Sequence, residues 1–136
     1  MRWQLKALKH AKEDDPELFL HLGEIYHALK DNAKARDYLN KALAIKPDFA
    51  EAHTNLGIAL KELGKLDESV ASYHKALAIR PDYAKAHYNL GNALWDLGKL
   101  EEAMTSYHRA LDLKPDYAET HSNLGSALKN QGKLDE

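Results

Sequence analysis

The 136-residue sequence contains no cysteine, which excludes a disulfide framework, a thiolate zinc site and a thiol nucleophile. Long apolar runs are also missing, and the longest are only a few residues, so we expect no membrane-spanning segment. Charge of one sign is not in excess, because 19 Lys and Arg stand against 21 Asp and Glu. A nucleic-acid-binding domain normally has a concentrated basic face, so this balance argues against one.

β-Branched residues are scarce. The chain has one Val, four Ile and three Thr, against 22 Leu and 20 Ala. This balance favours helices and leaves few residues suited to strands. The composition therefore predicts an all-α protein. Since no signal peptide or transmembrane segment is visible, we expect a cytoplasmic location.

What the sequence does have is a period of 34 residues. Pro47, Pro81 and Pro115 follow one another at this spacing. Glycines repeat with the same period in two series, which are Gly23, Gly57, Gly91 and Gly125, and Gly64, Gly98 and Gly132. Segments 50–83 and 84–117 are identical at 21 of 34 positions. A fixed period of this size indicates stacked supersecondary units.

Each unit has the pattern of two helices joined by a glycine turn. Leu56, Leu60 and Leu63 fall on one helical face. Gly64 then breaks the pattern, and a second apolar stripe ends before Pro81. A single pair of helices cannot bury its own apolar faces, so neighbouring pairs must stack into a solenoid.

Two acidic residues are placed to cap helix starts. Asp48 stands three residues before Glu51, which is the spacing of a capping box. Asp15 directly precedes Pro16, and proline is favoured in the first turn of a helix. We therefore expect one helix to begin just after Asp15 and another just after Asp48.

The phase of the period predicts three whole units between two partial ones. We expect the second helix of a partial repeat at 1–15, a diverged unit at 16–49, units at 50–83 and 84–117, and the first helix of an incomplete unit at 118–136. The last repeat stops just after Gly132, where its second helix would begin. We therefore expect an incomplete array or a fragment of a longer protein.

The repeated motif resembles the tetratricopeptide repeat family, whose pattern is Trp-x2-Leu-Gly-x2-Tyr, then Ala-x3-Phe, then Pro. In unit 84–117 the pattern reads His87, Leu90, Gly91, Leu94, Ala103, Tyr107 and Pro115. The departures are His for Trp and Leu for Tyr. The resemblance implies a right-handed superhelical solenoid of antiparallel helix pairs. It also implies that the first helices line a concave groove for a peptide or a partner helix, and it implies no catalysis.

The residues of such a groove can be predicted by comparing the two most similar units. Their first helices differ at only five positions, and all five fall on one stripe. In unit 84–117 these positions are Lys85, Tyr88, Asn92, Trp95 and Asp96. An exposed surface allows such variation, so the first four are predicted to bind a peptide. Trp95 is a candidate aromatic anchor, or alternatively packs over a neighbouring helix.

Asn55, Asn89 and Asn123 recur at one place in three successive units. In a helix interior each is roughly 0.6 kcal/mol less favourable than Ala, so the repetition needs a reason. First helices about 8–10 Å apart would place one amide at about every third residue of an extended peptide. The run His-x-Asn-Leu-Gly is similar to repeats of O-linked N-acetylglucosamine transferases, which implies an asparagine ladder holding substrate polypeptide. The alternatives are inheritance by duplication, or amides bonding between repeats.

The eight histidines do not predict a metal site. His53, His87 and His121 recur at the repeat period. Ligands on units about 8–10 Å apart cannot share an ion that needs donors near 2.1 Å. No phosphate loop, nucleophile elbow or catalytic carboxylate pair is visible either. We therefore expect no metal, no cofactor and no enzymatic activity.

The two ends predict self-association. Segment 1–12 has the pattern of a basic amphipathic helix, which aligns with a second helix of a preceding unit. Apolar residues at both ends would lack a partner helix: Trp3, Leu5 and Leu8 at one end, and Leu124, Leu128 and Leu134 at the other. Because the two orphan halves are complementary, chains could associate head to tail or swap terminal helices.

Three functions follow from these patterns. The first is an interaction module that binds an extended peptide or partner helix of another protein, with no nucleic acid and no membrane as partner. The second is the substrate-recruiting arm of a larger glycosyltransferase similar to O-GlcNAc transferase. The third is a self-assembling scaffold.

Overall fold

The computed structural model describes residues 15–135, and the side chains of residues 15–132. This part of the chain contains seven α-helices and no strand, which confirms the all-α prediction. The helices are α2 (Pro16–Ala28), α3 (Asn32–Ile45), α4 (Ala50–Glu62), α5 (Leu66–Ile79), α6 (Ala84–Asp96), α7 (Leu100–Leu113) and α8 (Ala118–Asp135). Within these residues, no helix combines the length and the apolar character needed to cross a bilayer.

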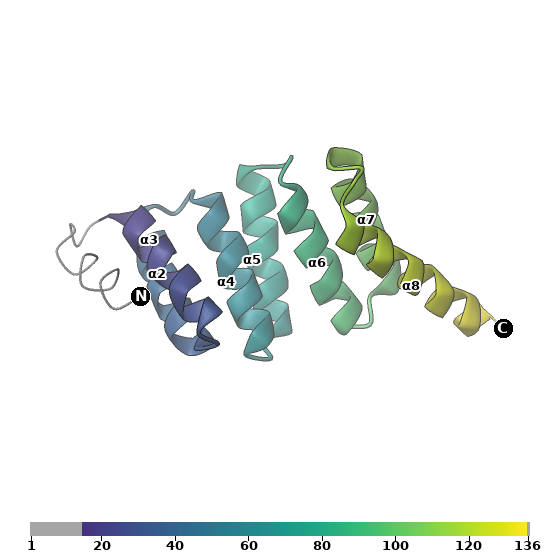
Figure 1. Ribbon diagram of the computed structural model, residues 1–136, viewed down its shortest axis with the longest axis horizontal. Coiled ribbons are helices and arrows are strands. Elements are labelled where there is room, and N and C mark those ends of the chain that lie inside the picture. Colours follow the sequence, from purple (N-terminus) through teal and green to yellow (C-terminus); the bar gives the residue numbers. More distant parts are fainter. Residues whose placement is uncertain (1–14, 136) are drawn as a thin grey trace.

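The helices form two layers in a right-handed superhelical solenoid (Figure 1). The inner layer consists of α2, α4, α6 and α8, and the outer layer of α3, α5 and α7. The inner helices α2, α4 and α6 each pack against the outer helix that follows, α8 packs against the preceding α7, and α4 also contacts α2 and α6 in its own layer. Stacking of successive pairs therefore buries faces that one pair would leave exposed.

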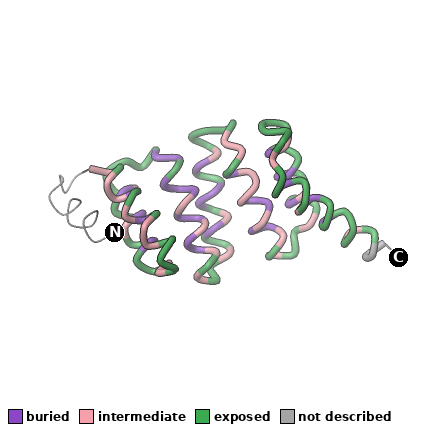
Figure 2. The backbone as a smooth tube through the Cα atoms, in the orientation of Figure 1, coloured by how far each residue is buried: buried purple, intermediate pink, exposed green. Residues whose placement is uncertain are grey.

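The core runs between the two layers along the length of the stack (Figure 2). The repeated Leu-Gly motif is explained here by a close approach between helices. A Cβ atom added at Gly57 would lie 2.5 Å from Cε1 of Tyr73, and one added at Gly91 would lie 2.5 Å from Cε1 of Tyr107. The missing side chain thus makes room for the ring of the second helix.

The turns within each pair use the left-handed backbone region. Gly64 has φ 80° and Gly98 has φ 79°, which only glycine adopts readily. In the diverged unit the same place holds Lys30, with φ 64°. A left-handed residue with a Cβ costs roughly 1–2 kcal/mol, so this turn is the strained one of the three.

One of the two predicted helix caps is confirmed. The carboxylate of Asp15 accepts the backbone N–H of Glu17 at 3.0 Å, and α2 begins at Pro16. The prediction for Asp48 is wrong, because α4 begins at Ala50 with Phe49 at its N-cap and no side-chain cap bond. The Phe49 side chain is instead buried in the core.

Helix α8 differs from the expectation in two ways. It continues through Gly132, although the equivalent Gly64 and Gly98 lie in turns. Within the described residues, no further helix folds back on α8, and Gly132 retains the helical conformation. Leu124 does not lack a partner, since it is buried in the cluster that contains Tyr107. Trp3, Leu5 and Leu8 lie outside the described residues, as does the side chain of Leu134.

Candidate functional site

The inner layer contains a hollow of about 300 Å³ between α4, α6 and α8. We call it the inner groove, and its lining residues are Lys61, Asn92, Trp95, Asp96, Asn123 and Ser126. Three of the predicted site residues meet here from two different helices. The groove also includes Lys61, Asp96 and Ser126, which were not among the predicted site residues.

An amide network closes one side of the inner groove. Asn123 Nδ2 donates to Asn92 Oδ1 at 2.8 Å and to the Tyr88 hydroxyl at 3.2 Å. The hydroxyl of Tyr107 donates to the same Asn92 oxygen at 2.6 Å. Burial also disfavours the Tyr107 phenolate and raises the pKa of this residue to about 12. Asn92 thus joins α6, α7 and α8 through one carbonyl oxygen.

The three repeated asparagines have three different partners. Asn55 Nδ2 donates to Glu24 Oε1 at 3.4 Å, which is a bond between successive units. Asn123 also bonds to the preceding unit, through Asn92. Asn89 instead donates to the Lys85 carbonyl within its own helix, at 2.9 Å. Bonding between repeats, the alternative left open by the sequence, therefore describes two of the three amides.

The position that determines these partners lies 31 residues before each asparagine, on the preceding inner helix. Glu24 and Asn92 can accept a hydrogen bond there, whereas Ile58 cannot. Asn89 faces Ile58 at this register and turns to its own backbone. The sequence comparison included Ile58 as a variable position but did not connect it with the asparagines. Aligning each asparagine with the preceding unit would have shown the pairing.

The two aromatic residues of the predicted site have different environments. Tyr88 lies between two other tyrosines, with ring centroids 6.2 Å from Tyr107 and 5.0 Å from Tyr117. It therefore stabilises the junction of α6, α7 and α8. Trp95 is half-buried, packs against the same core cluster and lines the inner groove. The Trp95 ring is thus both a packing element and part of the groove surface.

The variable stripe is not uniformly exposed. Lys85 is exposed on α6, as expected. Thr54, which holds the place of Tyr88 in the preceding unit, is fully buried, and its hydroxyl donates to the Ala50 carbonyl at 3.1 Å. A small side chain whose hydroxyl is hydrogen-bonded to the backbone of its own helix can therefore be buried at this place.

The charges of the inner groove are paired. Lys61 Nζ lies 3.6 Å from Asp96 Oδ2, and the two side chains come from neighbouring inner helices. Both are partly exposed, so the pair contributes at most about 1 kcal/mol to stability. Its effect is to leave the groove polar without a strong net charge.

The periodic histidines hold the loops before the inner helices. Nε2 of His53, His87 and His121 lies 2.7, 2.9 and 2.7 Å from the carbonyl oxygen of the proline six residues earlier. Because a carbonyl oxygen only accepts, Nε2 must carry the proton in each case. Among residues 15–132, no cluster of three or more His, Asp or Glu side chains could hold a metal ion.

Comparison with known proteins places this geometry in a family. The model of the TPR repeat matches residues 23–64, 59–98 and 92–132. Among solved structures, the first TPR of Spaghetti (RPAP3), bound to the HSP90 peptide SRMEEVD, is 26% identical, with a TM-score of 0.85. That match covers 90% of this chain and 98% of the other. MamA is 27% identical, with a TM-score of 0.86 over 98% of this chain and 78% of its own.

Two larger proteins contain a similar segment. An O-GlcNAc transferase of Thermobaculum terrenum is 33% identical, with a TM-score of 0.81 over 87% of this chain and 23% of its own. The peroxisomal targeting signal receptor of Eremothecium gossypii is 31% identical over 70 residues, which are 52% of this chain. This chain spans only 12% of that receptor's length. Since the family model matches most of the sequence, the chain belongs to the TPR repeat family.

Proposed function

We propose that this chain is a non-catalytic interaction module that binds an extended segment of a partner protein in the inner groove. The observation that carries the proposal is the lining of that groove, which combines the Trp95 ring with amide groups from two helices. An amide both donates and accepts, so it can pair with a peptide backbone whatever the side chains are. The similar RPAP3 domain with its bound peptide supports this use of the fold.

Each of the predicted residues has a role in this proposal. Trp95 contacts an apolar side chain of the ligand, while Asn89 and Lys85 bind along the backbone further up α6. Asn89 is suited to this because its amide bonds only within its own helix. Asn55 and Asn123 hold neighbouring inner helices in register and offer their remaining amide atoms. Tyr88 and Asn92 support the groove through the network at α8.

A selection of binders from a random peptide library tests the proposal. Trp95→Ala and Asn89→Ala should each weaken binding of the selected peptides, because this proposal places both residues against the ligand. Since Trp95 also packs against the core, circular dichroism must show that Trp95→Ala stays folded. Thr105→Ala is a matched control, since Thr105 is exposed on α7 in the outer layer and, like Asn89, bonds to a carbonyl of its own helix. Equal loss in all three variants, or no selectable peptide, would overturn the proposal.

The peptide SRMEEVD gives a sharper arm of the same test. Its acidic residues suit a groove with free cations, but Lys61 here is paired with Asp96. We therefore expect SRMEEVD to bind more weakly than the selected peptides. If SRMEEVD bound more strongly, the groove would recognise an acidic tail, and the proposal that its amides pair with any peptide backbone would be wrong.

The similarity to O-GlcNAc transferase supports a second candidate, the substrate-recruiting arm of a larger glycosyltransferase. In that case the inner groove would present a substrate polypeptide to a catalytic domain elsewhere in the same protein. The test is to read the gene on both sides of these 136 residues. A gene without a sugar-nucleotide domain would remove this candidate.

An open face on α8 supports a third candidate, self-association through a second copy of the chain. A Cβ added at Gly125 would meet nothing within 4 Å, whereas the equivalent Gly57 and Gly91 are covered by tyrosine rings. Leu128, one turn further on, is 52% exposed. A head-to-tail contact or exchange of terminal helices would cover this face.

Light scattering over a wide concentration range tests self-association. Leu128→Lys should shift the chain toward monomer, whereas Leu113→Lys, at an exposed leucine on α7, should not. A wild-type chain that stays monomeric at every concentration would refute this candidate.

A further inference from the structure

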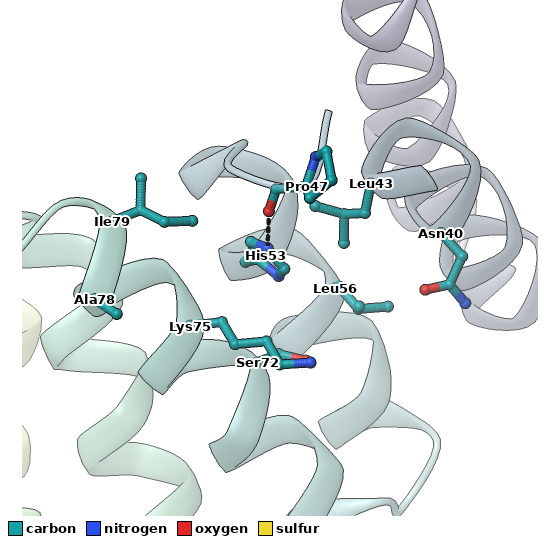
Figure 3. A pocket seen from close by; sticks show the side chains of 9 residues that line it. All are labelled: Asn40, Leu43, Pro47, His53, Leu56, Ser72, Lys75, Ala78 and Ile79. Carbon is teal, nitrogen blue, oxygen red and sulfur yellow. Dashed lines mark hydrogen bonds between the residues drawn. The ribbon is translucent and has the colours of Figure 1, made fainter. Parts of the chain in front are cut away.

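The outer layer has a hollow of its own, between α3 and α5 (Figure 3). Its volume is about 580 Å³, with Leu56 of α4 among its lining residues and Leu43 and Ile79 contributed by the two outer helices. A smaller hollow of about 300 Å³ shares residues with it, including Asn40 and Lys75. We call the two together the outer groove. It lies on the opposite layer from the inner groove.

The two ends of the outer groove differ in character. One end is apolar, with Leu43, Pro47 and Ile79, and Ile79 is 41% exposed. The other end has Arg36 and Lys65 on its rim. A ligand that fits both ends must therefore carry an apolar group at one end and negative charge at the other.

The rim carries more positive than negative charge. Arg36, Lys65 and Lys75 face the groove together with one acid, Glu68. Lys65 Nζ lies 3.9 Å from Glu68 Oε2, and Arg36 Nε lies 3.3 Å from Asp37 Oδ1. Within the described residues, Lys75 makes no ion pair, and its side chain lies along the opening (Figure 3). The positive charge of Lys75, which no acidic side chain neutralises among the described residues, therefore lies between the basic end and the apolar end.

The next gap in the outer layer, between α5 and α7, gives an internal comparison. At the equivalent places, Val70 stands for Arg36 and Asp112 stands for Ala78. The charged residues at these places are Lys99 and Arg109 against Glu102 and Asp112. The positive rim therefore belongs to the gap between α3 and α5 and is not a general property of the repeat.

We propose that the outer groove binds a short acidic segment of a partner protein, with an apolar side chain against Leu43 and Ile79 and carboxylates beside Lys75 and Arg36. Charge complementarity selects an acidic occupant, and the apolar end adds an anchor. The groove follows α5 from Glu68 to Ile79, which is about 16 Å at the helical rise of about 1.5 Å per residue. About five residues of extended chain cover this distance. The site is separate from the inner groove and does not depend on the function proposed for it.

The test uses short synthetic peptides that carry a Leu-Phe pair and an Asp-Glu pair separated by two glycines, in both chain orders. Titration into isotope-labelled protein should move the amide resonances of Asn40, Ser72 and Lys75 in NMR spectra, with dissociation constants up to about 1 mM. Peptides with lysines in place of the acids should bind at least about fivefold more weakly. Peptides with alanines in place of Leu-Phe should also lose affinity, because the anchor is missing.

Two variants locate the site. Lys75→Glu replaces attraction by repulsion and should weaken the acidic peptides by about five- to tenfold. Arg109→Glu makes the same change at the equivalent place on α7 and should leave the affinity unchanged. Both residues are exposed, and circular dichroism checks that each variant stays folded. Equal loss in both variants, shifts confined to Asn92 and Ser126 of the inner groove, or no shifts with either peptide order would overturn the proposal.

Discussion

The α4–α5 and α6–α7 pairs share 21 of 34 residues and the same order of helices, yet they differ in how the hydroxyl of their buried tyrosine is bonded. In the α6–α7 pair, the Asn92 oxygen accepts from the Tyr107 hydroxyl and from Asn123. In the α4–α5 pair Ile58 stands at this place, and the buried hydroxyl of Tyr73 has no partner among the described residues. The repeat thus specifies the packing of the tyrosine ring, whereas the variable residue at position 58 or 92 determines whether its hydroxyl has an amide acceptor.

The difference extends into the groove. Because Ile58 cannot accept a hydrogen bond, Asn89 turns to its own helix and stays available to a ligand. Because Asn92 can accept, Asn123 is bound to the preceding unit. The difference between Ile58 and Asn92 therefore separates an amide that bonds within its own helix from one that bonds between units.

The largest expected effect on stability concerns a feature that both pairs share, the close packing of a tyrosine ring on a glycine. Gly57→Ala and Gly91→Ala each place a Cβ 2.5 Å from a buried tyrosine ring, and a ring cannot yield as a flexible chain does. We expect each variant to lose about 2–3 kcal/mol of unfolding free energy, measured by urea denaturation.

Gly125→Ala is the matched control for this experiment. The same substitution on α8 meets no atom within 4 Å, so the better helix propensity of Ala should stabilise by up to about 1 kcal/mol. Similar losses at all three glycines would show that backbone effects, and not the rings, explain the motif.

The second largest effect is expected from a substitution that makes the α6–α7 pair resemble the α4–α5 pair. Asn92→Ile removes the acceptor of the Tyr107 hydroxyl, which is buried with its residue only 1% exposed. An unpaired buried hydroxyl costs about 1–3 kcal/mol, so we expect a loss of about 2 kcal/mol in urea denaturation. The double variant with Tyr107→Phe should recover most of this loss. If the double variant is no more stable than Asn92→Ile, the hydroxyl is not the cause.

Most of the fold could be predicted from the sequence because the apolar frame repeats. The period located the helix pairs and the glycine turns at Gly64 and Gly98, whose φ values are positive as such turns require. The capping pattern of Asp48 misplaced the start of α4, which begins at Ala50, the first residue of the unit at 50–83. The period also implied an end to α8 near Gly132, although a glycine ends a helix only where packing favours the turn.

The inner groove could be predicted only in part. Comparing units found Asn92 and Trp95, because the variable stripe includes positions that line the groove. It did not show that Thr54 is enclosed or that Tyr88 lies between two tyrosines, since both depend on contacts between units. Amide partners are also set between units, so a comparison within single helices does not reveal them.

The third effect separates the two tyrosine hydroxyls directly. Tyr107→Phe removes a hydroxyl that donates to Asn92 and should lose about 1 kcal/mol. Tyr73→Phe removes a buried hydroxyl without a partner, so stability should stay the same or rise by up to about 1 kcal/mol. Urea denaturation of both variants gives the comparison. Equal losses would mean that Tyr73 has a partner in solution, such as a bound water.

The smallest expected effect is a difference in ionisation between the same two residues. Burial disfavours both phenolates, raises the pKa of Tyr107 from 10.0 to about 12, and raises that of Tyr73 more strongly. The unfolded chain releases these protons near pH 10 and the folded chain only above it. Stability is therefore unaffected below pH 10 and falls as the pH rises from 10 towards 12.

Absorbance of the tyrosinate measures this difference. In a pH titration of the folded chain, Tyr107→Phe should remove a component near pH 12, whereas Tyr73→Phe should remove only the component that follows it. Asn92→Ile should shift the component near pH 12 that belongs to Tyr107, because the Tyr107 hydroxyl then loses its hydrogen-bond acceptor. In that variant neither buried tyrosine hydroxyl has a partner among the described residues. If both residues ionise together with the exposed tyrosines near pH 10, the two rings are not enclosed in solution as the packing against Gly57 and Gly91 requires.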